Sequence, residues 1–169
     1  MPTVKHPSSC EPMLQANRPH PRPQLSRARD EASGAGVSRG AALRVLIVED
    51  DYLVSGEMEA ELSAAGFQVV GIAASAAEAV RLAQAREPHL VVMDIALQGT
   101  GDGIDAALEI FRSKGIRSLF ASAFHDAETR RRAQPAAPLG WLAKPYTMSL
   151  LVQAVRNAVL ELGGRAGRP

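Results

Sequence analysis

Five polar residues that could together support phosphoryl chemistry stand at the ends of short apolar runs in this sequence. They are Glu49, Asp50, Asp94, Ser122 and Lys144. Clustered carboxylates repel one another, so such a group favours a hard divalent cation such as Mg2+, which prefers oxygen ligands and needs only one or two protein carboxylates. A carboxylate beside that cation could accept a phosphoryl group, which the hydroxyl and the ammonium group could then contact.

The apolar runs before these residues predict the elements that would bring them together. The runs span residues 45–48, 90–93, 119–121 and 139–143. A short apolar run bounded by turn residues is typical of a strand buried on both faces, as in a parallel sheet covered by helices. Ligands of such open sheets bind beyond the carboxyl ends of the strands, so we expect these residues to converge on one crevice.

Each of these residues taken alone has a simpler explanation. The acidic residues 49–51 could merely favour the positive N-terminal end of a following helix, and we expect Asp51 to do so. That explanation does not account for Asp94, which follows a different run. Lys144 could be a solvated side chain, but Pro145 restricts the backbone before it, and the Lys144–Pro145 bond is a candidate for a cis peptide.

From Leu43 onward the sequence alternates predicted strands with predicted helices, which is typical of an α/β fold with a parallel sheet. Strands are predicted at residues 44–48, 68–73, 89–93, 117–122 and 139–143. Helices, from apolar residues at helical spacing, are predicted at residues 52–65, 76–86, 104–114, 126–133 and 147–162. One domain over residues 43–162 accounts for all of them.

Residues 1–42 differ in composition from this domain. They are rich in Pro, Arg, Ser and Gly and lack hydrophobic periodicity, so we expect a disordered tail, with a second, short flexible tail at residues 163–169. The chain carries a net charge of +1, of which residues 1–42 contribute +3, so the remainder carries −2. A slightly acidic domain argues against a nucleic-acid-binding face.

Membrane and secreted proteins are also not expected. No run approaches the roughly 18 apolar residues of a membrane span. The proline-rich first thirty residues lack the apolar core of a secretory signal. Cys10 is the sole cysteine, so no internal disulfide can form. These features together predict a cytoplasmic protein.

On these residues, the chain from about Arg44 to Leu162 resembles the receiver domain of two-component response regulators. Segment 45–51 (VLIVEDD) is similar to the family's opening strand and acidic pair, and segment 91–95 (VVMDI) to the strand that ends at its phosphoacceptor aspartate. Segments 120–124 (FASAF) and 140–145 (GWLAKP) match its switch hydroxyl, switch aromatic and lysine. The resemblance implies a doubly wound (βα)5 flavodoxin-like parallel sheet with strand order 2-1-3-4-5.

The same resemblance implies a phosphoacceptor and a metal site. Asp94 would accept the phosphoryl group. Mg2+ or Mn2+ would be held by Asp50, Asp94 and the backbone carbonyl of Ala96, with Glu49 acting through water.

The resemblance also implies a switch and its partners. Lys144 would pair with a phosphoryl oxygen, Ser122 would move to hydrogen-bond another, and Trp141 would fill the space that Ser122 leaves. A sensor histidine kinase or a histidine phosphotransfer protein would supply the phosphoryl group, and a downstream protein would bind the face at 126–162. Seven residues follow the last predicted helix, so no DNA-binding domain is expected, and homodimerisation is left open.

Two features depart from the pattern of the family. The loop after Asp94 lacks the proline common there and carries Gly99, Gly101 and Gly103, which predicts a more flexible loop. The switch hydroxyl belongs to Ser122, and the switch aromatic is Trp141 where Tyr or Phe is usual.

Two alternative functions belong to other classes. A phosphorylation-independent interaction module could keep the same fold, but the intact acidic pair, Asp94 and Lys144 argue against it. A phosphatase with an aspartyl nucleophile usually needs a second aspartate two residues further on, where this chain has Ala96.

Overall fold

The sheet forms from the apolar runs that the sequence predicts. In the computed structural model, which describes residues 42–123 and 126–165, five parallel strands pair in the order β2-β1-β3-β4-β5. The strands are β1 (Arg44–Val48), β2 (Gln68–Ala73), β3 (Leu90–Met93), β4 (Arg117–Ser122) and β5 (Gly140–Ala143). The α/β class and the strand order expected from the sequence are confirmed.

Helices α1 to α4 begin at side chains that accept hydrogen bonds from otherwise unpaired backbone N–H groups. The helices are α1 (Tyr52–Ala64), α2 (Ala76–Arg86), α3 (Gly103–Lys114), α4 (Ala127–Ala133) and α5 (Met148–Arg165), with a short 3-10 helix at Gln134–Ala136. The N-terminal caps of α1 to α4 are Asp51, Ser75, Asp102 and Asp126. Such caps stabilise helix starts, and the capping role predicted for Asp51 is confirmed.

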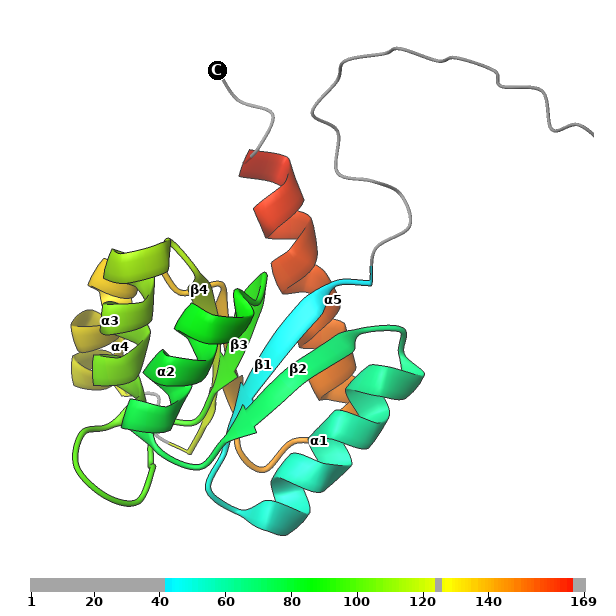
Figure 1. The fold of residues 1–169 in the computed structure, drawn as a ribbon, viewed down its shortest axis with the longest axis horizontal. Coiled ribbons are helices and arrows are strands. Elements are labelled where there is room, and N and C mark those ends of the chain that lie inside the picture. Colours follow the sequence, from blue (N-terminus) through cyan, green and yellow to red (C-terminus); the bar gives the residue numbers. More distant parts are fainter. Residues whose placement is uncertain (1–41, 124–125, 166–169) are drawn as a thin grey trace, which may run out of the picture. The chain divides into compact units, whose positions relative to one another are not determined.

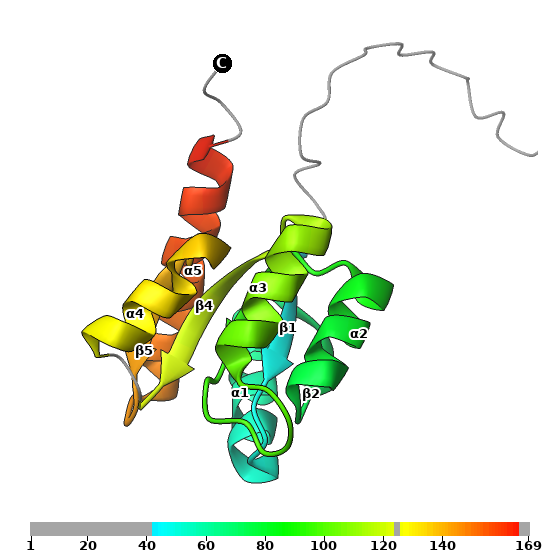
Figure 2. The same cartoon turned by 90° about the vertical axis from the view of Figure 1, so that its left-hand side faces the viewer.

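Helices cover both faces of the sheet (Figures 1 and 2). Along β1, Val45 and Ile47 point to the face covered by α1 and α5, whereas Leu46 and Val48 point to the face covered by α2, α3 and α4. This alternation is the period-two geometry of a strand. Because both faces are buried, the strand must be apolar throughout, as its sequence is.

Strand β5 differs from the prediction. The sequence predicted residues 139–143 to be buried on both faces, like the other runs. Instead, Gly140, Trp141 and Leu142 are only partly buried, and Ala143 is exposed. The reason is the position of β5 at the edge of the sheet, where it pairs only with β4.

One predicted boundary, the C-terminal end of the last helix, is wrong. Helix α5 continues to Arg165, so residues 163–165, predicted as the start of a tail, are helical. Apart from Ala42, the prediction for residues 1–42 lies outside the described residues, as does the remainder of the predicted C-terminal tail. Among the residues that the structure describes, no helix has the length and apolarity to cross a membrane.

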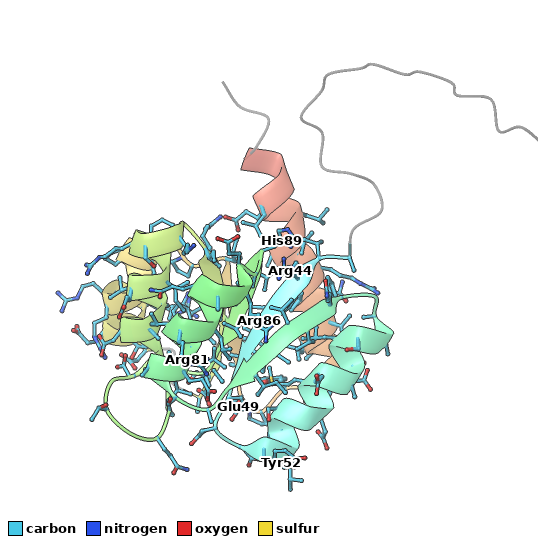
Figure 3. The ribbon with its side chains drawn as sticks, viewed as in Figure 1. Arg44, Glu49, Tyr52, Arg81, Arg86 and His89 are labelled. Atoms are coloured by element: carbon cyan, nitrogen blue, oxygen red, sulfur yellow. The ribbon has the colours of Figure 1, made fainter. Side chains whose placement is uncertain are left out.

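The two ends of β1 carry different groups (Figure 3). At its start, the backbone N–H of Arg44 donates a hydrogen bond to Nδ1 of His89 at 2.9 Å. Glu49 and Tyr52 lie beyond the opposite end. Since the strands are parallel, the residues that follow β1, β3, β4 and β5 all lie at this same end of the sheet, beyond the carboxyl ends of the strands.

Candidate functional site

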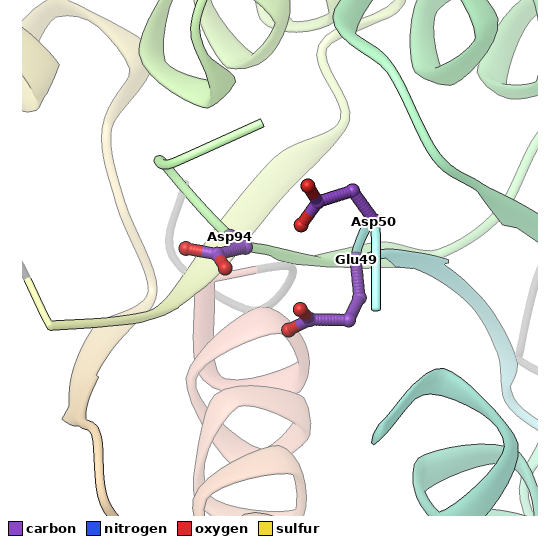
Figure 4. Close-up of side chains that lie close together, drawn as sticks. All are labelled: Glu49, Asp50 and Asp94. Carbon is purple, nitrogen blue, oxygen red and sulfur yellow. The ribbon is translucent and has the colours of Figure 1, made fainter. Parts of the chain in front are cut away.

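Glu49, Asp50 and Asp94 lie together beyond the carboxyl ends of β1 and β3 (Figure 4). The two strands pair with Val48 beside Met93, and the N–H of Asp94 donates to the carbonyl of Val48 at 2.9 Å. One carboxylate oxygen from each acidic residue lies within 4.8 Å of the other two. The structure therefore brings together the three acidic residues that the sequence pointed to.

These three carboxylates differ in burial. Glu49 is 4% exposed and Asp94 is 5% exposed, whereas Asp50 is only partly buried. A buried carboxylate is unfavourable unless it is paired or hydrogen-bonded. Glu49 and Asp94 therefore need a compensating charge, while Asp50 keeps access to solvent.

Lys144, directly after β5, supplies that charge. Its Nζ lies 2.5 Å from Oε2 of Glu49 and 2.6 Å from Oδ2 of Asp94. Burial acts to lower the pKa of Lys144, but the hydrogen bonds and charges of Asp94 and Glu49 outweigh burial, and this pKa is raised. Burial is the strongest influence on Glu49 and raises its pKa in spite of Lys144. One ammonium group thus compensates the acidic cluster incompletely.

The donor set fits a divalent cation. Three carboxylates and one ammonium group leave a net charge of −2 at the site. Oxygen donors of this kind suit Mg2+ or Mn2+, which keep several waters when bound. The carbonyl of Ala96 was expected to join them. The N–H of Ala96 donates to Oδ1 of Asp94 at 3.1 Å, which orients that carboxylate.

Gly103, at the start of α3, packs against the backbone of Asp94. A Cβ atom on Gly103 would lie 1.9 Å from the carbonyl oxygen of Asp94, which no side chain can occupy. Its N–H also donates to the carbonyl of Ile95 at 3.0 Å. The sequence prediction treated the glycines of this loop as a source of flexibility. Gly99 and Gly101 have positive φ angles of 105° and 84°, a backbone conformation that favours glycine, whereas Gly103 is buried and needed for close packing.

Ser122 ends β4 and is 2% exposed. Its carbonyl oxygen accepts a hydrogen bond from the N–H of Lys144 at 3.2 Å. The backbones that carry the hydroxyl and the lysine are therefore joined directly. The Lys144–Pro145 peptide bond is cis.

Trp141 lies against the sheet and α4. Its ring stacks on Phe120 with centroids 4.7 Å apart and planes inclined by 21°. The guanidinium of Arg130 in α4 lies 5.2 Å from the centroid of the same ring. Trp141 is thus placed to respond to a movement of α4 relative to β5.

The structure is a parallel α/β sheet that carries its carboxylates and lysine beyond the carboxyl ends of its strands, and sequence comparison identifies the family. Residues 45–156 match the response regulator receiver domain. The chain therefore belongs to the receiver domain family of response regulators, which act in two-component systems.

Characterised relatives are longer than the matched region. The transcriptional regulatory protein PdtaR of Mycobacterium tuberculosis is 37% identical over 116 residues, which cover 69% of this chain and 56% of PdtaR. The phyllosphere-induced regulator PhyR of Methylorubrum extorquens is 31% identical over 139 residues, which cover 80% of this chain and 51% of PhyR. This chain spans about half the length of these curated relatives.

Solved structures show the same fold. The signal receiver domain of a modulated diguanylate cyclase from Desulfovibrio desulfuricans G20 superimposes with a TM-score of 0.67 at 30% identity, covering 74% of this chain and 99% of that domain. A CheY-like receiver domain protein from Methanospirillum hungatei JF-1 has a TM-score of 0.69 at 21% identity, with the same coverage of 74% and 99%.

Proposed function

We propose that this chain is a stand-alone receiver that accepts a phosphoryl group on Asp94 from a sensor histidine kinase or a histidine phosphotransfer protein. One observation carries the proposal. The buried Asp94 carboxylate is held by Lys144 Nζ at 2.6 Å and by the N–H of Ala96 at 3.1 Å, beside two further acidic side chains. Phosphoryl transfer depends mainly on positioning and on neutralising charge, and this site offers both.

In the transfer, an oxygen of Asp94 forms a bond to phosphorus while the bond from phosphorus to the donor's imidazole nitrogen breaks. The imidazole leaves with that electron pair and takes up a proton. Lys144 then forms an ion pair with an oxygen of the bound phosphoryl group. A bound Mg2+ or Mn2+ would neutralise phosphoryl charge, and Asp50, Asp94, the carbonyl of Ala96 and, through water, Glu49 would hold it.

The same proposal includes a switch. The hydroxyl of Ser122 would donate a hydrogen bond to another phosphoryl oxygen, and Trp141 would move into the space that Ser122 leaves. Phosphorylation would thus shift the population between two arrangements of these side chains. A downstream protein would then bind the changed face at 126–162, which holds α4, β5 and α5. The proposal includes a cytoplasmic location for this chain, because the chain must be where the phosphodonor can reach Asp94.

The test compares two neighbouring acidic positions. Wild type, Asp94→Asn and Asp51→Asn are incubated with Mg2+ and acetyl phosphate, and the acyl phosphate is mapped by mass spectrometry. Asp51→Asn keeps a capping side chain and lies outside the three-carboxylate cluster, so we expect it to be labelled like wild type. Asp94→Asn should remain unlabelled. Equal labelling of Asp94→Asn and wild type would refute the proposal.

The alternatives draw no specific support from the site. A phosphorylation-independent interaction module does not require a lysine that bridges Glu49 and Asp94. A phosphatase would need an acid or base near the position of Ala96, which carries only a methyl group.

A further inference from the structure

Helix α4 carries three consecutive arginines whose guanidinium groups point to different partners. Arg130 lies over the Trp141 ring, as described above. Arg131 pairs within α4 with Glu128 at 2.6 Å. The side chain of Arg132 extends away from α4 and pairs at 2.7 Å with Asp102, which lies 30 residues away in the sequence. One arginine therefore ties α4 to the start of α3.

The Asp102 end of this ion pair is fixed relative to the phosphoacceptor. The Asp102 carboxylate caps α3 by accepting hydrogen bonds from the N–H groups of Ile104 at 2.9 Å and Asp105 at 3.0 Å. The next residue, Gly103, packs so closely on the carbonyl of Asp94 that no Cβ fits between them. The start of α3 is therefore in direct backbone contact with Asp94, and the N–H of Gly103 is also hydrogen-bonded to the carbonyl of Ile95 at 3.0 Å.

The Arg132 end is much less constrained. Helix α4 has seven residues, all of them described, and only Ala133 is buried. With so little apolar contact, the position of α4 depends strongly on polar contacts. Three residues separate Ser122 from Asp126, the N-terminal cap of α4. Ser122 is therefore close in the sequence to the start of α4, and a displacement of Ser122 toward a phosphoryl group would act near this helix.

We propose that the Arg132–Asp102 ion pair holds α4 in the unphosphorylated arrangement and so opposes switching at Asp94. Arg132 is a positioning residue that acts through Asp102. This inference rests on the proposed function, because it concerns the shift that phosphorylation would cause. When α4 moves and Asp102 stays with Asp94, the pair loosens. Breaking the pair beforehand removes its contribution to the resting state and favours the switched state.

The size of the effect follows from the exposure of the pair. The Arg132 side chain is 45% exposed and that of Asp102 is 30% exposed. Ion pairs of this exposure contribute modestly, and their loss corresponds to a change of about two- to fivefold in an equilibrium constant. The affinity for a phosphoryl analogue should change by this factor.

The experiment uses full-length protein, Mg2+ and beryllofluoride as the phosphoryl analogue, with Trp141 fluorescence as the signal, since Trp141 is the only tryptophan of the chain. Arg132→Gln removes the pair to α3. Arg131→Gln is the matched control, because it makes the same charge change one position away and removes a pair inside α4. We expect Arg132→Gln to need about two- to fivefold less beryllofluoride for half-saturation than wild type, and Arg131→Gln to match wild type.

A double-mutant cycle separates the ion pair from other effects of the substitutions. Asp102→Asn keeps a side chain that can cap α3 but removes its charge. Arg132 also lies 3.8 Å from Asp105, a longer contact that Asp102→Asn leaves in place. If the pair acts as proposed, adding Arg132→Gln to Asp102→Asn shifts half-saturation much less than adding it to wild type. Unfolding free energies, measured in parallel, identify a purely structural role, which would lower stability without changing half-saturation.

The outcomes distinguish the inference from the function on which it rests. Equal half-saturation in Arg132→Gln and Arg131→Gln overturns the inference, as does weaker binding in Arg132→Gln. A wild-type protein that shows no Mg2+-dependent response to beryllofluoride and no labelling by acetyl phosphate overturns the proposed function, and the inference with it.

Discussion

Asp50 and Asp51 are neighbours in the sequence but have different surroundings in the structure. Asp51 accepts hydrogen bonds from the N–H groups of Leu53 at 2.8 Å and Val54 at 3.2 Å. Asp50 instead faces Glu49 and Asp94 in the acidic cluster. The start of α1 at Tyr52 explains this difference, because the residue directly before a helix can accept hydrogen bonds from its first N–H groups, and that residue is Asp51.

This difference predicts separable effects on metal binding and stability. Asp50→Ala should weaken Mg2+ binding with little loss of stability, because it removes a carboxylate from the cluster. Asp51→Ala should lower the free energy of unfolding by about 1 kcal/mol through loss of the cap, with little change in Mg2+ affinity. Calorimetric titration with Mg2+ and urea unfolding measure the two quantities. If Asp51→Ala weakened Mg2+ binding more, the assignment of these two residues would be reversed.

Two glycines allow a test of close packing at the site. Gly103→Ala should lower the free energy of unfolding by about 2 kcal/mol or more, because its methyl group would overlap the carbonyl of Asp94. Gly56, inside α1, has no atom within 4 Å of an added Cβ. Gly56→Ala should therefore raise stability by about 0.5–1 kcal/mol through helix propensity. Chemical denaturation measures both, and similar effects of the two substitutions would show that Gly103 is not tightly packed.

At the scale of elements, the start of α3 carries several polar contacts near the site. The side chains of Asp102 and Asp105 form a reciprocal capping box, and Arg132 of α4 adds an ion pair. Burial acts to raise the pKa of Asp102, but the hydrogen bonds from the backbone and from Arg132 outweigh it. The pKa of Asp102 is therefore lowered from its ordinary value of 3.8.

This lowered pKa predicts a pH dependence of stability. A carboxyl whose pKa is lower in the folded state stabilises the fold above its ordinary pKa, and this contribution is lost as the pH falls through the folded-state pKa. Asp102→Asn retains a capping side chain but cannot titrate. Wild type should therefore be more stable than Asp102→Asn near neutral pH, and the difference between the two unfolding free energies should shrink as the pH falls below 3.8 and through the lowered folded-state pKa. Curves that stay parallel throughout acidification would contradict this assignment.

For the whole molecule, the segment from β1 to α5, residues 44–165, contains every residue of the candidate site. The sequence of residues 1–40 shows no hydrophobic periodicity, and none of the site residues predicted from the sequence lies there. Deleting residues 1–40 should therefore leave labelling of Asp94 by acetyl phosphate unchanged and shift the melting temperature by less than about 2 °C. Calorimetry and mass spectrometry of the truncated and full-length proteins provide the comparison. A large fall in melting temperature would show that the tail stabilises the domain.

Much of this fold follows from local patterns in the sequence. Apolar runs predicted the strands within one residue, and the alternation of strands with helices indicated a parallel sheet. The parallel sheet in turn explains how Glu49 and Lys144, separated by 95 residues, come to lie 2.5 Å apart. These features were predictable because apolar runs and capping side chains are local signals in the sequence.

Other features depend on how distant elements pack, which no local pattern encodes. Arg117 opens the apolar strand β4, yet it is 8% exposed, because Glu161 of α5 pairs with it at 2.7 Å. The requirement for Gly103 arises from its approach to Asp94, and the partner of Arg132 comes from another helix. The sequence gives the type of each side chain, and its spacing indicates the direction in which the side chain points. The packing of strands and helices against one another decides which other side chain it contacts.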